Sequence, residues 1–206
     1  MEASLLYLAA VMQHAPSNFV SLARSPSRPV LVYTDASLEK GVARLGAWVL
    51  VPGARVRVLT YDVSERLLSW RGPSEHIINQ IELLTAPVLA VSAPGLIRNR
   101  DVLWFIDNSA AESALVKAGS PTQTMSRFAL VASACLGRLR CRPRYDHVAS
   151  ADNPADALSR GGREDPEVAP RVASGAYVVV SPVEPPTDRL EYQLLWGSPE
   201  GLGLPL

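Results

Sequence analysis

The first 160 residues alternate between short apolar runs and segments with helical spacing. Residues 30–33 form an apolar, β-favouring run without helical spacing, which predicts a buried central strand. Residues 45–51 and 56–63 are the next strand candidates, and the Pro-Gly-Ala sequence between them has the length of a hairpin connection. We therefore expect three consecutive antiparallel strands.

Helical spacing begins after these strands. Ser74 is a suitable N-cap for a helix with apolar residues at Ile77, Ile78, Ile81, Leu83 and Leu84. Pro87 is expected to kink or end this helix, because proline lacks the backbone donor. Further along the chain, the pattern predicts a buried strand at 102–106, helices at 109–118 and 122–139, a strand at 142–148 and a helix at 154–160. This order predicts an α/β fold, with a mixed five-stranded sheet and helices on both faces.

The two ends of the chain differ from this body. Residues 3–13 have the pattern of a short amphipathic helix, and a Ser/Arg/Pro-rich linker follows it. After Gly161 the pattern dissolves into Pro, Gly and acidic residues, with one strand-like patch at 177–180. We therefore predict an N-terminal helix and linker at 1–27, a folded domain at 28–162 and an acidic, Pro-rich tail at 163–206.

The formal charge balances at 20 basic against 20 acidic residues, but its distribution is uneven. Residues 161–206 carry three Arg against seven Asp and Glu, so residues 1–160 carry 17 basic and 13 acidic groups. Lys40 and Lys117 are the only lysines, and arginine suits bidentate contacts to phosphate. The composition of the genome explains this preference equally well. A mildly basic body permits nucleic-acid binding without requiring it.

Cysteine usage and the N-terminal run bear on where the protein acts. Cys135 and Cys141 have no accompanying cluster of His or Cys, so neither a zinc site nor a disulfide framework is supported. We expect reduced thiols in an intracellular protein, either cytoplasmic or nuclear. The run LLYLAAVM is too short to span a bilayer, and no Lys or Arg precedes Arg24. Neither a secretory signal nor a membrane partner is expected.

Four carboxylates stand at marked positions, namely Asp35, Glu82, Asp107 and Asp156. Taken singly, each has an ordinary explanation as a turn, helix-surface or first-turn acid. Asp35 and Asp107, however, each follow a buried strand, and acids at the carboxyl ends of neighbouring strands converge. Four acids crowded together would repel one another unless divalent cations neutralise them, and oxygen ligands select Mg²⁺ or Mn²⁺. Two such ions form a site that can cleave phosphodiesters.

Four strings resemble, in order, the ribonuclease H domain attached to reverse transcriptases of retroelements: TDAS at 34–37, IELL at 81–84, IDNSAA at 106–111 and NPADALSR at 153–160. The last is the most specific, because it is similar to an NPAD-x-x-SR form in DIRS and Pao elements and to the ADALSR ending in Gypsy-like elements. The resemblance covers about residues 28–162. It implies a ribonuclease H-like fold that cuts the RNA strand of RNA–DNA hybrids. It also implies two Mg²⁺ or Mn²⁺ ions, held by the catalytic carboxylates Asp35, Glu82, Asp107 and Asp156.

Several other residues are candidates for contact with nucleic acid. Arg140, Arg142 and Arg144 alternate, so they would share one face of a strand or its lead-in. They would either grip phosphates or form a solvated edge that blocks strand-to-strand aggregation. Resemblance and position add Ser37, Asn79 and Asn108 to the nucleic-acid-binding candidates. They also make His147 a candidate for the mobile catalytic His that cellular members often carry.

Three functions stay open at this point. The first is a metal-dependent ribonuclease H-type endonuclease, part of or derived from a retrotransposon polyprotein, with the reverse transcriptase of the same element as a candidate partner. The second is a catalytically inactive ribonuclease H-fold module that binds nucleic acid or a polymerase, and the four retained acids argue against it. The third is an integrase or exonuclease on the same fold, which the NPADALSR ending disfavours. The discriminating observation is whether the four carboxylates lie within reach of one or two cations.

Overall fold

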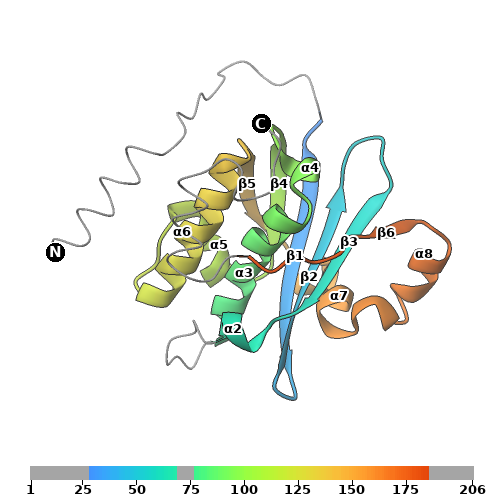
Figure 1. Cartoon of the computed structure of the whole chain (residues 1–206), viewed down its shortest axis with the longest axis horizontal. Helices are drawn as coiled ribbons and strands as arrows, with labels where there is room; N and C mark the ends of the chain where they lie inside the picture. Colours follow the sequence, from blue (N-terminus) through green and yellow to red (C-terminus); the bar gives the residue numbers. More distant parts are fainter. Residues whose placement is uncertain (1–27, 69–76, 186–206) are drawn as a thin grey trace. The chain divides into compact units, whose positions relative to one another are not determined.

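The computed structural model of the chain describes residues 28–68 and 77–185, and Figure 1 shows them arranged around a mixed sheet. Six strands cross this sheet in the order β5-β4-β1-β2-β3-β6. Their bounds are Val30–Glu39 for β1, Val42–Leu50 for β2, Val56–Asp62 for β3, Asp101–Ile106 for β4, Arg142–His147 for β5 and Tyr177–Val179 for β6. The predicted α/β class and mixed sheet are confirmed, but the sheet has six strands rather than the predicted five.

The pairing of the strands explains this order. β1, β2 and β3 are consecutive antiparallel neighbours, as the hairpin-length connections predict. β4 lies parallel to β1 on its other side, and β5 lies parallel to β4. Parallel neighbours need crossover connections, which are supplied by α3 (Ile77–Ser92), α5 (Ser109–Lys117) and α6 (Gln123–Arg138).

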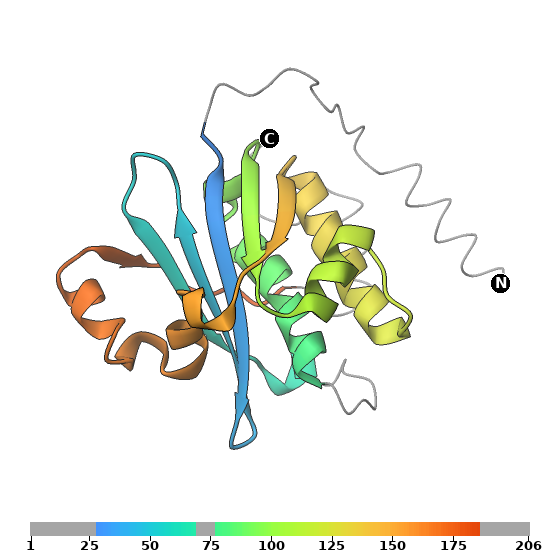
Figure 2. The same cartoon turned by 180° about the vertical axis from the view of Figure 1, so that it is seen from behind.

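Helices cover both faces of the sheet, as predicted. Figures 1 and 2 show α3, α5 and α6 on one face, and α7 (Asp156–Arg160) and α8 (Ala169–Ala173) on the other. The first face holds the larger core, in which Trp104, Phe128 and Leu83 are almost completely buried. Four short helical segments complete the described elements: α2 (Glu65–Leu68), α4 (Pro94–Ile97), η1 (Ser150–Asp152) and η2 (Gly162–Glu164). Pro87 was expected to kink or end α3. The helix does not end there, since it continues to Ser92.

Part of the segment predicted as a tail belongs to the sheet. Residues 28–68 and 77–185 belong to one compact unit, and β6 pairs in parallel with β3 through Val58 and Val179. On the second face, Trp48 and Tyr177 pack against a buried cluster that includes Val58. The strand-like patch at 177–180 of the sequence therefore corresponds to a strand of the sheet, β6. The predicted helix at 3–13 and the predicted cap at Ser74 lie outside the described residues.

Across residues 28–68 and 77–185, no helix has the length and apolar character needed to cross a membrane.

Candidate active site at the carboxyl ends of β1 and β4

The site is built first by strand register. β1 and β4 are parallel, and their pairing ends with Thr34 opposite Ile106. Asp35 and Asp107 therefore leave the paired region at the same end of the sheet. Glu82 approaches from α3, where its Oε1 accepts a hydrogen bond from the backbone N–H of Ala36 at 3.1 Å. Asp35, Glu82 and Asp107 each offer a carboxylate oxygen within 4.8 Å of the oxygens offered by the other two.

Burial makes this cluster electrostatically costly. Asp35 is 6% exposed and Glu82 is 5% exposed. Burial raises the pKa of Asp35 to about 6, and the negative charges of Asp107 and Asp156 act in the same direction. A hydrogen bond from Ser159 opposes this shift. Burial also raises the pKa of Glu82 well above its usual range, with further contributions from Asp35 and Asp107.

One oxygen of the cluster shows what would balance these charges. Glu82 Oε2 is buried and has no hydrogen-bond partner in the described structure. A buried carboxylate oxygen without a donor is unfavourable, whereas a hard divalent cation prefers such ligands. The unpaired oxygen and the two neighbouring acids therefore fit a divalent metal site formed by Asp35, Glu82 and Asp107.

Asp156, the fourth predicted carboxylate, is not part of the three-acid cluster. Its Oδ1 accepts a hydrogen bond from Arg160 Nε at 2.8 Å, within the same short helix. It nevertheless lines the same cleft of about 490 Å³ as Asp35 and Asp107, and its charge contributes to the raised pKa of Asp35. The structure thus brings three predicted acids together and places the fourth at the wall of their cleft.

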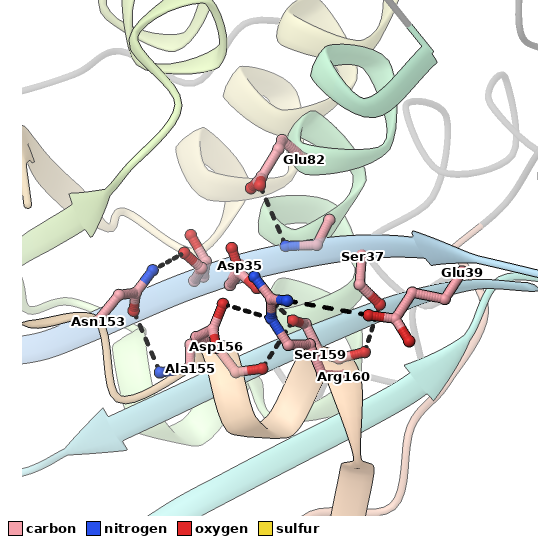
Figure 3. Close-up of polar contacts among 11 residues, drawn as sticks. Asp35, Ser37, Glu39, Glu82, Asn153, Ala155, Asp156, Ser159 and Arg160 are labelled. Carbon is pink, nitrogen blue, oxygen red and sulfur yellow. Dashed lines mark hydrogen bonds and ion pairs between the residues drawn. The ribbon is translucent and has the colours of Figure 1, made fainter. Parts of the chain in front are cut away.

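The beginning of α7 is tied to β1 by a buried asparagine. Asn153 donates from Nδ2 to the Thr34 carbonyl at 3.0 Å, and its Oδ1 accepts from the Ala155 N–H at 3.1 Å. One turn further on, the Ser159 hydroxyl donates to Asp35 Oδ2. Figure 3 shows how these contacts bring the NPAD segment and the end of α7 onto the strand that carries Asp35.

The end of α7 is held by three strands. The last carbonyls of a helix have no partner within the helix, so they need donors from elsewhere. Each of the first three strands supplies one: Ser37 on β1 donates to Ser159 O at 2.5 Å, Arg44 on β2 to Arg160 O at 2.7 Å and Thr60 on β3 to Leu158 O at 3.1 Å. Ser37 was predicted to contact nucleic acid. In the structure, its hydroxyl group donates a hydrogen bond to the Ser159 carbonyl at the end of α7.

Gly46 makes the close seating of α7 feasible, and the sequence analysis missed it. It lies on β2 directly opposite Asp35. A Cβ at this position would lie 2.6 Å from both the Ala155 carbonyl oxygen and the Ser159 nitrogen. The available signal was a glycine within the strand pattern LGAWVLV, because a glycine inside a strand marks close approach of another backbone.

The two predicted asparagines pair with each other beside Asp107. Asn108 Nδ2 donates to Asn79 Oδ1 at 2.8 Å. Asn108 Oδ1 accepts from the N–H groups of Ala110 and Ala111, so Asn108 is the N-cap of α5. Both side chains are partly buried, and these contacts join the start of α5 to α3, which carries Glu82.

The predicted arginines lie at the other end of the sheet. Arg142 stands opposite Asp101 at the start of β4, whereas His147 stands opposite Ile106 at its end. Arg142 and Arg144 share the exposed side of β5, but Arg140 precedes the strand, with a left-handed φ of 49°. His147 therefore lies nearer to Asp107 than the three arginines do. The arginines do not contact the carboxylates.

Comparison with solved structures identifies the fold. Ribonuclease H1 from the archaeon Halobacterium salinarum NRC-1 superposes with a TM-score of 0.50 at 19% identity, covering 66% of this chain and 98% of that chain. The chain has the ribonuclease H fold. The N-terminal ribonuclease H domain of a Mycobacterium tuberculosis protein also superposes, with a TM-score of 0.49, 16% identity and coverage of 70% of this chain and 97% of that chain. A third match is LC11 ribonuclease H1 in complex with an RNA/DNA hybrid, with a TM-score of 0.48, 12% identity and coverage of 63% and 92%. No family model and no curated protein matches the sequence.

Proposed function

We propose that the ribonuclease H-like domain of this chain is a metal-dependent endonuclease that hydrolyses the RNA strand of RNA–DNA hybrids. The observation that carries this proposal is the convergence of Asp35, Glu82 and Asp107, together with the buried, unpaired Oε2 of Glu82. A scaffold without catalysis gains nothing from mutually repelling buried acids. The LC11 ribonuclease H1 was solved in complex with an RNA/DNA hybrid, which is the substrate class proposed for this chain.

The roles of the residues follow from their positions. Asp35, Glu82 and Asp107 would hold Mg²⁺ or Mn²⁺, with Asp156 as a fourth ligand for a pair of ions. Bound ions would favour attack by water and neutralise the charge that develops on the leaving 3′ oxygen. Ala36 positions Glu82 through its N–H, and Ser159 orients Asp35 through its hydroxyl. Water adds to phosphorus as the bond to O3′ breaks, leaving a 5′ phosphate and a 3′ hydroxyl.

We also infer that this domain derives from a retroelement polyprotein, whose reverse transcriptase would be its partner in the cytoplasm or nucleus. The support is the NPADALSR string, the most specific of the four motifs. Its Asn153, Asp156, Ser159 and Arg160 side chains all make the polar contacts that organise α7 beside Asp35.

The direct test is cleavage of a labelled RNA–DNA hybrid in Mg²⁺ or Mn²⁺. We expect cutting of the RNA strand, its loss on chelation of the metal, and its loss in Asp107→Asn. Glu167→Gln is the matched control, because it neutralises an exposed acid that precedes α8 and lies outside the cleft. Cutting that persists in Asp107→Asn would contradict the proposed site.

A second function is favoured by the state of Asp156. Its carboxylate is paired with Arg160 and lies outside the three-acid cluster. An inactive ribonuclease H-fold module would tolerate this arrangement and still bind nucleic acid or a polymerase. Hybrid binding without cleavage in either metal would support that function over the nuclease.

A further inference from the structure

Arginines gather at the end of the sheet that lies away from the carboxylates. We call this cluster the arginine pole and define it by residues of two loops, the last residue of α6 and two residues of β5: Arg98, Arg100, Arg138, Arg140, Arg142 and Arg144. A backbone hydrogen bond from Asn99 N to Leu139 O joins the two loops, and one from Arg142 N to Arg100 O joins the start of β5 to the first loop, both at 2.9 Å. The cluster is therefore fixed by the fold, although its members come from two separate parts of the chain.

The arginine pole carries a large excess of positive charge. Within residues 97–102 and 137–144 there are six arginines and one acid, Asp101. That acid is already used, because Asp101 Oδ1 accepts from Arg142 Nε at 2.6 Å. Arg100, Arg140 and Arg144 are exposed, and none of them forms an ion pair within residues 28–68 and 77–185. Because the exposed side chains of Arg100, Arg140 and Arg144 carry like charges at one end of the sheet, they repel one another, and an anionic partner would stabilise this end.

The partner that fits this charge best is a phosphate backbone. A planar guanidinium binds phosphate oxygens in a bidentate manner, and an array of arginines matches a repeating array of phosphates. From Asp101 to Asp107, β4 rises about 20 Å at about 3.3 Å per residue. At about 3.4 Å per nucleotide along one strand, that distance corresponds to roughly six nucleotides.

An open surface connects the two ends of the sheet. Leu103 and Phe105 on β4 and Tyr33 on β1 lie on the same face as Asp101, and the Tyr33 and Phe105 rings stack with centroids 4.6 Å apart. Figure 2 shows this face of β4 and β5 without a helix over it among the described residues. A duplex that follows these strands meets the carboxylates at one end and the arginine pole at the other.

We propose that the arginine pole is a second binding site for the RNA–DNA hybrid, which contacts its backbone about six nucleotides from the phosphate in the cleft. This inference rests on the proposed function and adds to it a length requirement. Hybrids long enough to span both ends of the sheet would bind more tightly than hybrids that reach only the cleft. The affinity gained would depend on salt, because phosphate contacts release counterions.

The test measures hybrid binding by fluorescence anisotropy in the Asp107→Asn protein, which prevents turnover. One probe is a hybrid of about 18 base pairs, and the other is a hybrid of about five base pairs whose strands are joined by a loop so that it stays paired. The variants are Arg100→Glu and Arg140→Glu. Arg171→Glu is the matched control, because it makes the same charge change on exposed α8, beside β6 at the opposite edge of the sheet from β5.

We expect each pole variant to weaken binding of the long hybrid roughly tenfold at low salt and to reduce the slope of log affinity against log salt by about 1. Binding of the short hybrid should not change, and the control should change neither. The inference is overturned if the long hybrid binds as before, if both lengths lose affinity equally, if the control has the same effect, or if no hybrid binds.

Cleavage measured without the Asp107 substitution separates this inference from the proposed function. RNA-strand cleavage with no effect of the pole variants on affinity would leave the nuclease standing and remove the second site. Pole-dependent binding of the long hybrid without any cleavage would do the reverse.

Discussion

The three-acid cluster and Asp156 lie at one cleft, which Asp35, Asp107 and Asp156 line, but they are positioned by different means. Asp35 and Asp107 are placed by the register of two parallel strands, and Glu82 is held against β1 by a buried hydrogen bond. Asp156 begins a helix of five residues, which depends on side chains from three strands for its position. A helix this short has almost no stability of its own. The comparison indicates a rigid part of the site that is electrostatically strained and a second part that is relaxed but easily displaced.

Glu82→Gln should break the strained part with the largest effect. The substitution keeps the shape of the side chain but removes a buried charge, so the metal-free protein should become more stable. Cleavage should fall more than about 100-fold, because the loss of a residue that only contacts a metal ligand typically costs about 10–100-fold.

Asp156→Asn should change the free energy of unfolding of the metal-free protein by no more than about 0.5 kcal/mol, because Asp156 is partly exposed and paired with Arg160.

Urea unfolding with and without Mg²⁺, together with cleavage rates, measures these differences. If Glu82→Gln destabilised the metal-free protein, the buried carboxylate would not be the strained element. If Mg²⁺ stabilised Glu82→Gln as much as the parent protein, Glu82 would not be a ligand.

Gly46→Ala should break the second part of the site. The new methyl group would collide with the backbone at Ala155 and Ser159, and overpacking of this kind costs about 1–3 kcal/mol. Because the displaced helix carries Asp156 and Ser159, cleavage should fall together with stability. Gly137→Ala is the control: a Cβ at this position in α6 meets no atom within 4 Å, and alanine favours a helix by about 0.5–1 kcal/mol. Equal unfolding free energies for the two variants would show that α7 is not seated as described.

How far the site could be predicted depends on the sequence distance that each contact spans. Asp35 and Asp107 were predictable because each follows its own apolar strand, and parallel strands end together. Glu82 depended on the resemblance, since helical periodicity does not distinguish it from a surface acid. The anchors of α7 could not be predicted, because Ser37 and Ser159 are separated by 122 residues and a hydroxyl carries no pattern. The remote position of the arginines could have been predicted, because they precede or begin a strand reached by a parallel crossover.

The strained part of the site also predicts an unusual pH dependence in the absence of metal. The folded-state pKa of Asp35 is about 6, above the ordinary value of 3.8, so the folded protein binds the proton more tightly than the unfolded chain. The stability that this group contributes is complete below pH 3.8 and is lost as the pH rises through about 6. Between about pH 5 and 7 this loss amounts to about 1 kcal/mol from Asp35, and Glu82 shifts in the same direction.

Thermal unfolding in a chelator, at several values between about pH 5 and 7, measures this loss. Adding Mg²⁺ should restore stability at the upper end, where the carboxylates are charged. Asp35→Asn should flatten the profile. A metal-free protein that becomes steadily more stable toward neutral pH would contradict the raised pKa.

The smallest expected effect comes from one anchor of α7. Thr60→Val removes the hydroxyl that donates to Leu158 O at 3.1 Å while keeping the shape of the side chain. A partly buried hydrogen bond of this kind contributes about 0.5–1.5 kcal/mol, so the free energy of unfolding should fall by about 1 kcal/mol. Combining Thr60→Val with Ser37→Ala should cost more than the sum of the two, because both anchors hold the same short helix. If the two losses of unfolding free energy simply add, α7 stays in place when one anchor is lost. Asp156 would then be held almost as firmly as the three-acid cluster.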